Sequence, residues 1–312
     1  MVIKASVIVA NNLANWSFPK QVLGPGLEVI VVNNGIDGPG NPCWARNQGA
    51  KKAKGKYLVF LDNDTQVKKG WLDKVIKFMD QHSKVGAGQL KLLRMGSNKF
   101  DSAGDLITNN GFLAERAREV EDQGQFDKAE KIFSGKGAAI LVRKDVFAKI
   151  NGFDEAYVYY WEEPDLFWRV WQAGYEVRFL WMGTVYHNYG TKAKPIPKQP
   201  AAGQVYLACR NQLMTIIKNA QSRRLRMLFW VSLSWLGLEI MFVIKGKWKQ
   251  AWAIERAWRW LLGHFSQRLI GLWPRPKQRL KGSDQWLKQV MIKRDFKWYL
   301  GKGVSYVTGK PF

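Results

Sequence analysis

The stretch that most constrains the fold is Lys56–Thr65, KYLVFLDNDT. Tyr57–Leu61 is a short run of aromatic, β-branched and aliphatic residues, which predicts a strand buried on both faces. The run ends abruptly at Asp62 and Asp64, which are separated by one residue. Ligands of open α/β sheets bind at the carboxyl ends of the strands, and carboxylates supply the oxygen ligands that Mg²⁺ or Mn²⁺ prefers. The stretch therefore predicts half of a site for a metal ion and a diphosphate.

Two further runs of strand-forming residues precede this stretch, Ala5–Ala10 and Glu28–Val32. Ser17–Leu23, between them, has room for about two helical turns, and 41–55 predicts a loop and a basic helix. Strands that alternate with helices indicate a mainly parallel, doubly wound sheet. Ala5–Ala10 is shorter than the apolar region of a signal peptide, so we expect a first core strand and no export signal.

The composition is that of a folded protein. A chain of 312 residues is long enough for one large α/β domain and an appendage. A hydrophobic content of 46% can fill a core, which excludes a disordered protein. Its two cysteines, Cys43 and Cys209, predict no disulfide framework. This favours a reducing compartment such as the cytoplasm.

The net charge of +24 is concentrated in the C-terminal part of the chain. Residues 192–312 contain 24 basic residues against four acidic ones, and also nine of the 16 tryptophans. Basic residues interleaved with tryptophan suit an anionic membrane surface or a nucleic acid. No nucleic-acid reader motif accompanies the charge, so we expect a membrane partner and no nucleic acid.

Several stretches resemble one known family in the same order along the chain. After VIVA and EVIVVNNG comes ARNQGAKKAKGKYLVFLDND, and the later stretches are Ser102–Gly104, Gly137–Arg143, Gly152–Glu155 and Glu162–Leu166, ending near His187. Over about residues 3–220 the chain resembles the inverting family 2 glycosyltransferases with the GT-A fold, and most of all their bacterial rhamnosyltransferase-like branch.

The resemblance implies an α/β GT-A fold with a doubly wound mixed sheet. We expect a catalytic domain over residues 1–200 and a basic, Trp-rich helical extension over 201–312 that associates with a membrane. It also implies a site for Mg²⁺ or Mn²⁺ at Asp62 and Asp64, with His187 as a third metal ligand or a diphosphate contact. A structural role is the alternative for His187, because a lone histidine is more often structural. The donor, a nucleotide-diphosphate sugar, is expected at Ala10, Asn33, Asn34, Arg46, Asp62 and Asn63.

Two positions depart from the family pattern. The family usually has an aspartate that reads the nucleotide base where this chain has Asn33, and it more often has an aspartate where this chain has Glu163. A sugar-nucleotide or glycan binding protein with weak catalysis, or none, is therefore the alternative to an enzyme.

Glu162 and Glu163 lie at the start of a predicted helix, because Pro164 suits the first turn. Carboxylates there are stabilised by the helix dipole, so simple capping is one interpretation. The neighbouring aromatic residues and the family's paired acids favour an acceptor site at Trp161, Glu162 and Asp165. The family's second acid is the catalytic base, which implies that role for Glu163.

Leu106–Glu130 is polar and glycine-containing, which predicts either an irregular excursion over the donor site or a solvated loop with a surface helix. A helix over Gln204–Asn219 is expected to follow a Pro- and Lys-rich linker at 191–200.

Leu228–Ile244 is strongly apolar, has basic flanks, and is slightly short for a membrane span. A second apolar stripe runs through Ala251, Ile254, Trp258, Leu261, Phe265, Leu269 and Leu272. Because a span would place one basic flank outside, we expect an in-plane or re-entrant helix rather than a crossing one. The alternative is two helices packed on the catalytic domain. From Pro274 onward we expect a basic, partly ordered tail.

Together these features predict a metal-dependent inverting glycosyltransferase, peripheral or monotopic on the cytoplasmic face of the cell membrane. Its acceptor would be a hydroxyl of a glycan or of a lipid-linked glycan, in the synthesis of a cell-envelope polysaccharide.

Overall fold

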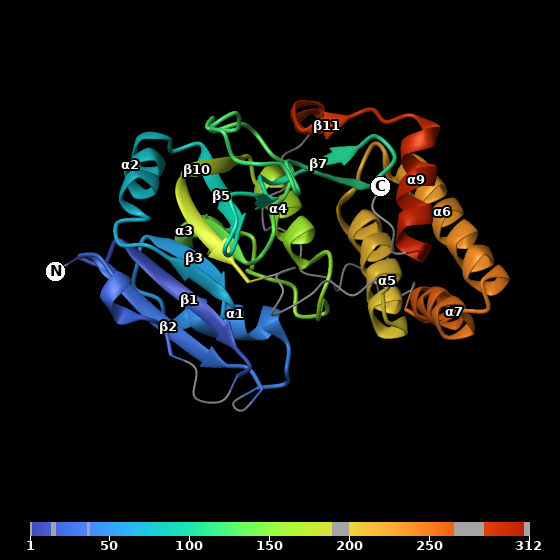
Figure 1. The fold of residues 1–312 in the computed structure, drawn as a ribbon, viewed down its shortest axis with the longest axis horizontal. Helices are drawn as coiled ribbons and strands as arrows, with labels where there is room; N and C mark the ends of the chain where they lie inside the picture. Colours follow the sequence, from blue (N-terminus) through green and yellow to red (C-terminus); the bar gives the residue numbers. More distant parts are fainter. Residues whose placement is uncertain (1, 14–16, 36–37, 189–199, 265–283, 309–312) are drawn as a thin grey trace.

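The fold is taken from a computed structural model that describes residues 2–13, 17–35, 38–188, 200–264 and 284–308 (Figure 1). The expected linker at 191–200, apart from its last residue, lies outside these residues. So do Phe265, Leu269 and Leu272 of the second apolar stripe, and parts of the expected tail.

The centre of the fold is a mixed sheet with the strand order β2-β1-β3-β9-β5-β10-β4, to which β6 adds beside β5. β1 pairs in parallel with β2 and β3, and β10 in parallel with β5, whereas β9 runs antiparallel between β3 and β5. The strands are β1 (Ala5–Asn11), β2 (Leu27–Asn33), β3 (Tyr57–Asp62), β4 (Thr65–Val67), β5 (Val85–Arg94), β6 (Phe100–Ser102), β9 (Ala139–Arg143) and β10 (Glu176–His187). This arrangement confirms the doubly wound mixed sheet.

Successive side chains of β3 enter two different cores, as the alternation of a strand requires. Leu58 and Phe60 belong to one buried cluster, and Tyr57, Val59 and Leu61 to the other. The first cluster includes residues of α1 (Pro42–Lys52), α3 (Lys144–Lys149) and α4 (Glu162–Gln172); the second includes α2 (Asp73–Gln81). Helices on both faces bury the strand completely, so its charged residues emerge only at its end.

A small second sheet holds part of the segment expected to be an irregular excursion. β7 (Asp105–Thr108) pairs with β8 (Leu113–Glu115) and with β11 (Met291–Ile292), which comes from far along the chain. Residues 116–138 contain no further helix or strand. The excursion is therefore partly ordered by pairing with the C-terminal part of the chain, and the surface helix of the alternative interpretation is not formed.

The C-terminal helices lie together on one side of the molecule, at the right of Figure 1. They are α5 (Ala202–Asn219), α6 (Arg224–Ile244), α7 (Trp248–Gly263) and α9 (Phe296–Thr308). Two short 3-10 helices occur elsewhere in the fold, at Lys20–Val22 and Gln285–Gln289. Buried residues of all four helices belong to the same hydrophobic cluster as Leu58 and Phe60 of the sheet. The hydrophobic core of the central sheet is thus continuous with that of the C-terminal helices.

α6 has 21 residues, four more than the expected Leu228–Ile244, and is long and apolar enough to cross a membrane. The expected shortness was wrong, because the helix begins within its basic flank at Arg224. One face, with Met227, Val231, Trp235 and Phe242, is buried against the protein. The opposite face is exposed, and its large apolar residues are Leu225, Phe229, Leu233, Leu236, Ile240 and Ile244.

Candidate active site

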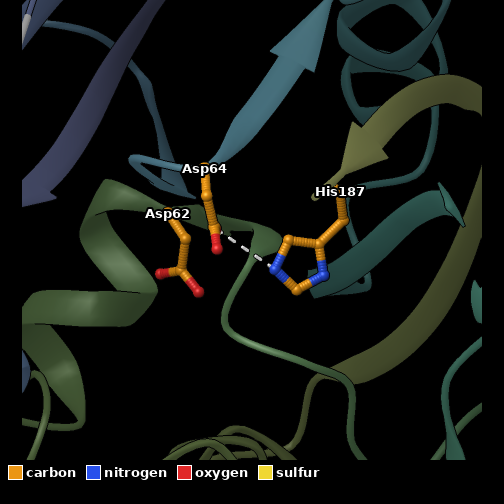
Figure 2. Close-up of side chains that lie close together, drawn as sticks. All are labelled: Asp62, Asp64 and His187. Atoms are coloured by element: carbon orange, nitrogen blue, oxygen red, sulfur yellow. Dashed lines mark ion pairs between the residues drawn. The ribbon is translucent and has the colours of Figure 1, made fainter. Parts of the chain in front are cut away.

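Asp62, Asp64 and His187 come together at one edge of the sheet (Figure 2). Asp62 ends β3, Asp64 lies in the turn before β4, and His187 ends β10, which pairs with β4 through His187 and Thr65. One ligand atom of each side chain lies within 4.8 Å of those of the other two. Two carboxylates and an imidazole at this separation fit a divalent cation that retains open positions for a substrate. The structure thus brings together the three residues predicted to bind metal.

The imidazole ring of His187 lies between two carboxylates, one beside each ring nitrogen. Its Nδ1 is 2.9 Å from Asp101 Oδ2 and its Nε2 is 3.2 Å from Asp64 Oδ1, the contact drawn as a dashed line in Figure 2. Burial favours the neutral ring, but hydrogen bonds to Asp101 and Asp64 outweigh it and raise the pKa of His187 to about 9. Asp101 is fully buried and is also paired with Lys136, at 3.0 Å. A carboxylate on the far nitrogen orients the ring as metal-binding histidines require.

Arg46 of α1 connects the metal-binding end of the site to the acids of α4. Its Nη2 donates to Asp62 Oδ1 at 3.0 Å, and its Nη1 lies 3.9 Å from Glu162 Oε1 and 4.0 Å from Glu163 Oε1. The guanidinium is almost fully buried, yet its pKa is raised, because the attraction of the three carboxylates exceeds the effect of burial. One cation therefore neutralises part of the charge of three acids that would otherwise repel one another.

Glu162 and Glu163 occupy the first turn of α4, as predicted. Glu163 keeps 16% of its side chain exposed and accepts a hydrogen bond from the Gly137 backbone N–H at 2.8 Å. Burial raises the pKa of Glu163, an effect that Arg46 and this N–H oppose. Burial and the charge of Glu163 raise the pKa of Glu162 well above its usual value. Glu163 is thus the more accessible and the better supported carboxylate of the two.

Several buried polar atoms of this region have no hydrogen-bond partner among the described residues. They are Arg46 Nε and Nη1, Glu162 Oε2 and Asn34 Oδ1. Buried polar groups in folded proteins are nearly always paired, so unpaired atoms that gather in one place are typical of a ligand site. The atoms of Arg46 and Glu162 lie beside Asp62 and Glu163, and Asn34 follows β2 at the same edge of the sheet, which fits a polar substrate bound along this edge.

The expected donor residues at the ends of β1, β2 and β3 are linked by asparagine side chains. Asn11 donates to Asn33 Oδ1 at 3.1 Å and accepts from Asn63 Nδ2 at 2.9 Å. Asn34 follows β2, and Ala10 pairs with Asp62 across β1 and β3. All six predicted donor residues therefore lie along this edge or on α1 beside it.

Trp161 and Asp165, both expected to bind the acceptor, differ in how deeply they are buried. Trp161 is half-buried and precedes Glu162, with a left-handed backbone at φ 69°. Asp165 is fully buried, and Arg169, Lys218 and Asn219 all bind its carboxylate. This placement contradicts acceptor binding by Asp165, because its carboxylate is fully buried and already paired. The pair with Arg169, four residues on, is an interaction within the helix.

Sequence reasoning did not identify Asn11, Asp101, Lys136 or Gly137 as site residues. Asp101 directly precedes the stretch Ser102–Gly104, and Gly137 begins Gly137–Arg143, both of which resemble the family. The position of these residues in or beside family-like stretches is the signal that was available. Their partners, His187 and Glu163, are far away in the sequence, so only the fold shows the contacts.

Part of the chain is similar in sequence to a known family and to several known proteins. Residues 34–150 match the family described as glycosyl transferase family 2. The pre-mycofactocin glycosyltransferase of Mycobacterium tuberculosis is 26% identical over 191 residues, which cover 54% of this chain and 39% of that protein. The O-antigen biosynthesis protein RfbC of Myxococcus xanthus is 28% identical over 161 residues, covering 48% of this chain and 12% of that protein. The chain thus spans well under half the length of these relatives.

Among solved structures, a crystal structure of GalNAc-T7 with UDP, GalNAc and Mn²⁺ is similar with a TM-score of 0.51. The sequences are 11% identical, and the match covers 88% of this chain and 58% of the other. An identity this low shows the fold alone. The chain therefore has the fold of the GT-A glycosyltransferases, and its residues 34–150 are similar to the glycosyl transferase family 2 domain.

Proposed function

We propose that this protein is a metal-dependent inverting glycosyltransferase of the rhamnosyltransferase-like branch. It moves a sugar from a nucleotide-diphosphate sugar to a hydroxyl of a glycan or lipid-linked acceptor. The observation that carries this proposal is the row of groups Asp64, Asp62, Arg46 and Glu163, which joins a divalent-cation site to a supported carboxylate. The similarity to RfbC, named for O-antigen biosynthesis, supports a role in making a cell-envelope polysaccharide.

Glu163 is the base in this proposal. Its accessible carboxylate takes the proton of the acceptor hydroxyl while the hydroxyl oxygen attacks the anomeric carbon from the face opposite the leaving group. The bond between that carbon and the diphosphate oxygen breaks, and the nucleotide diphosphate leaves with the electron pair. The Gly137 N–H holds one carboxylate oxygen of Glu163, which fixes the direction of the base.

Asp62, Asp64 and His187 would hold Mg²⁺ or Mn²⁺. Such an ion, when bound, offsets the negative charge of the diphosphate as it departs. Arg46 holds Asp62 in place through one carboxylate oxygen, which leaves the other for a ligand. The donor's nucleotide lies in this proposal along Asn33, Asn34 and Asn63, where Asn33 replaces the family's usual aspartate.

We also propose that the protein docks on the cytoplasmic face of a membrane through α6, in the plane of the surface. One face of this helix is buried on the protein, so the helix is not free to cross a bilayer alone. Its other face exposes large apolar residues, among them Leu225 at 84% and Phe229 at 62%. Basic residues flank both ends of the helix, and each is worth about 1 kcal/mol near an anionic surface.

Thermal unfolding with nucleotide diphosphates and Mn²⁺ tests the donor site directly. UDP, GDP and dTDP are each added with and without Mn²⁺, and the nucleotide of the true donor is expected to raise the melting temperature most. A ligand at a hundred times its dissociation constant stabilises the folded state by about 2.7 kcal/mol. Asp64→Asn should remove the Mn²⁺-dependent part of this shift, whereas Asp73→Asn, an exposed aspartate on α2, should leave it.

Transfer itself is then measured with the corresponding nucleotide sugars and a lipid-linked glycan extract as the acceptor. Metal-dependent release of the nucleotide together with a glycosylated product supports the proposal. A folded protein that binds none of the nucleotides, or an Asp64→Asn variant with an unchanged Mn²⁺ effect, would overturn it.

A further inference from the structure

The turn that leads into the catalytic helix has an unfavourable backbone. Tyr160 and Trp161 both adopt the left-handed conformation, with φ of 68° and 69°. Bulky residues rarely adopt it, and such a conformation persists only where the surroundings impose it. Glu162 and Glu163 follow immediately. Any relaxation of this turn therefore moves the start of α4 and the carboxylate of Glu163.

Two neighbouring side chains of α5 hold this turn. Asn211, which is fully buried, donates from Nδ2 to the backbone carbonyls of Tyr159 at 2.8 Å and Tyr160 at 2.9 Å. Arg210 donates from Nε to Asn211 Oδ1 at 2.8 Å, which fixes the direction of the amide. A second Arg210 nitrogen donates to the carbonyl of Ala156 at 2.9 Å. The pair thus binds three carbonyls of the segment just before Glu162.

Arg210 is in turn held by aromatic rings. Its guanidinium lies 4.8 Å from the ring centre of Trp260 on α7 and 5.5 Å from that of Tyr206 on α5. A guanidinium over an aromatic face is attracted by the ring, most strongly by tryptophan. A continuous row of contacts therefore leads from α7, through Arg210 and Asn211, to the turn before the base.

We infer that Arg210 and Asn211 are positioning residues for Glu163, and that α7 supports them through Trp260. This inference rests on the proposed function, because it assigns these residues to the placement of the base. It also gives the C-terminal helices a part in catalysis in addition to membrane docking. Both side chains are buried against the segment before α4, so the turn transmits their effect.

Asn211→Ala removes both hydrogen bonds to the turn, and Gln212→Ala is its matched control. Gln212 lies on the same helix and is also buried, but donates to the carbonyl of Gly111 instead. We expect Asn211→Ala to lower kcat at least about 10-fold, because misplacing a catalytic group by about 1 Å can reduce the rate 100-fold. The KM for the nucleotide sugar should change less than about 2-fold, since the donor residues lie elsewhere. Gln212→Ala should lower the melting temperature with kcat within about 2-fold of the parent.

A second measurement does not depend on activity. The side chains of Tyr159 and Tyr160 are 46% and 40% exposed, so chymotrypsin reaches them if the backbone there opens. Asn211→Ala should accelerate cleavage after these residues, and Gln212→Ala should not. Equal kcat and equal cleavage rates in the two variants would overturn the inference, while an inactive parent protein would instead count against the proposed function.

The role of α7 is tested at Trp260. Trp260→Leu should reproduce the loss of kcat in part, because the aromatic face over Arg210 is lost. Trp260→Phe, which keeps an aromatic face, should restore kcat to within about 3-fold of the parent. If both substitutions reduce kcat equally while leaving the chymotrypsin cleavage unchanged, α7 does not act through Arg210.

Discussion

Arg46 shows how a single residue can organise a whole site. Its guanidinium lies between Asp62, a candidate metal ligand, and the pair Glu162 and Glu163, and it is buried with two of its nitrogens lacking a hydrogen-bond partner among the described residues. A lysine at this position would be a poor substitute, because a single ammonium does not present several donors in one plane. The site therefore depends on the planar shape of this cation as well as on its charge.

The first prediction concerns Glu163→Gln. The amide oxygen of glutamine still accepts the Gly137 N–H, so the geometry is kept, but basicity is lost. A positioned base contributes about 10²- to 10⁴-fold, so transfer should fall at least about 100-fold with donor affinity nearly unchanged. In the parent enzyme the rate should fall toward acid pH around an apparent pKa above that of an ordinary glutamate, because burial raises the pKa of Glu163.

Glu162→Gln and Asp165→Asn are the controls for this substitution. A Glu163→Gln variant that transfers at the parent rate, while Glu162→Gln does not, would move the base to Glu162.

The second prediction concerns the pH dependence of metal binding. A metal ion binds the neutral imidazole, whereas the raised pKa of His187, about 9, keeps the ring protonated at neutral pH in the metal-free protein. The Mn²⁺ dissociation constant should therefore decrease about tenfold for each pH unit between pH 6 and 8. Calorimetric titrations at three pH values measure this slope, and His187→Gln should abolish it. A slope near zero in the parent protein would exclude His187 from the ligands.

At the scale of elements, α4 and α5 are joined by a buried ionic network. Lys218 of α5 lies 2.7 Å from Asp154 and 2.8 Å from Asp165, and Asp165 also binds Arg169. Lys218 and Arg169 lower the pKa of Asp165 to about 2, despite complete burial. This network fixes the helix that carries Glu162 and Glu163 against the helix that carries Arg210 and Asn211.

The third prediction follows from this network. Lys218→Met leaves Asp154 and Asp165 buried with one fewer counter-charge, which should lower the free energy of unfolding by about 3–5 kcal/mol. Arg259→Met, which breaks an exposed pair with Glu255 on α7, should cost less than about 1 kcal/mol. Urea unfolding monitored by tryptophan fluorescence measures both. Similar losses of unfolding free energy in the two variants would mean that burial does not increase the contribution of this network to stability.

The strand β5 illustrates what the sequence could not predict. It lies between β9 and β10 in the sheet, yet it contains two glycines and the polar Gln89 and Lys91. Gly88 is required because a Cβ there would lie 2.4 Å from the carbonyl oxygen of Arg178 on β10. Lys91 is neutralised by Asp122 and Asp127 of the excursion. The residues that explain Gly88 and Lys91 are far from β5 in the sequence, so no local pattern of hydrophobic residues predicts this strand.

At the scale of the whole molecule, local patterns predict the doubly wound sheet and the two acids after β3, whereas the GT-A fold and the role of His187 were implied by the family resemblance. The run at Tyr57–Leu61 and the acids after it need no distant partner. Asp165 was assigned to the acceptor site because its neighbours Glu162 and Glu163 lie there, but a helix turns its successive residues to different sides. The contact of Asp101 with His187 could not be predicted from the sequence, because the two residues are 86 positions apart.

The fourth prediction concerns the outward face of α6. Replacing Leu225, Phe229 and Leu236 together by glutamine should leave the fold intact, since all three are exposed, but weaken sedimentation with vesicles that contain phosphatidylglycerol. Binding of the parent should fall as salt rises, because the basic flanks contribute through screened charges. Val120→Gln, an exposed apolar position on the excursion, is the control. Equal sedimentation of the triple variant and the parent would count against docking through α6.

The continuous core also limits how this chain can change over evolutionary time. Because Met227, Val231 and Trp235 share one buried cluster with Leu58 and Phe60, α6 is not a detachable anchor. A hybrid that joined residues 1–200 to the helices of another protein would place foreign side chains in that cluster and lose its packing. In the proposed docking, adaptation to a different membrane is therefore open only to outward positions such as Leu225 and Phe229. The inward positions of the same helix must change in concert with the side chains of residues 1–200 that they contact.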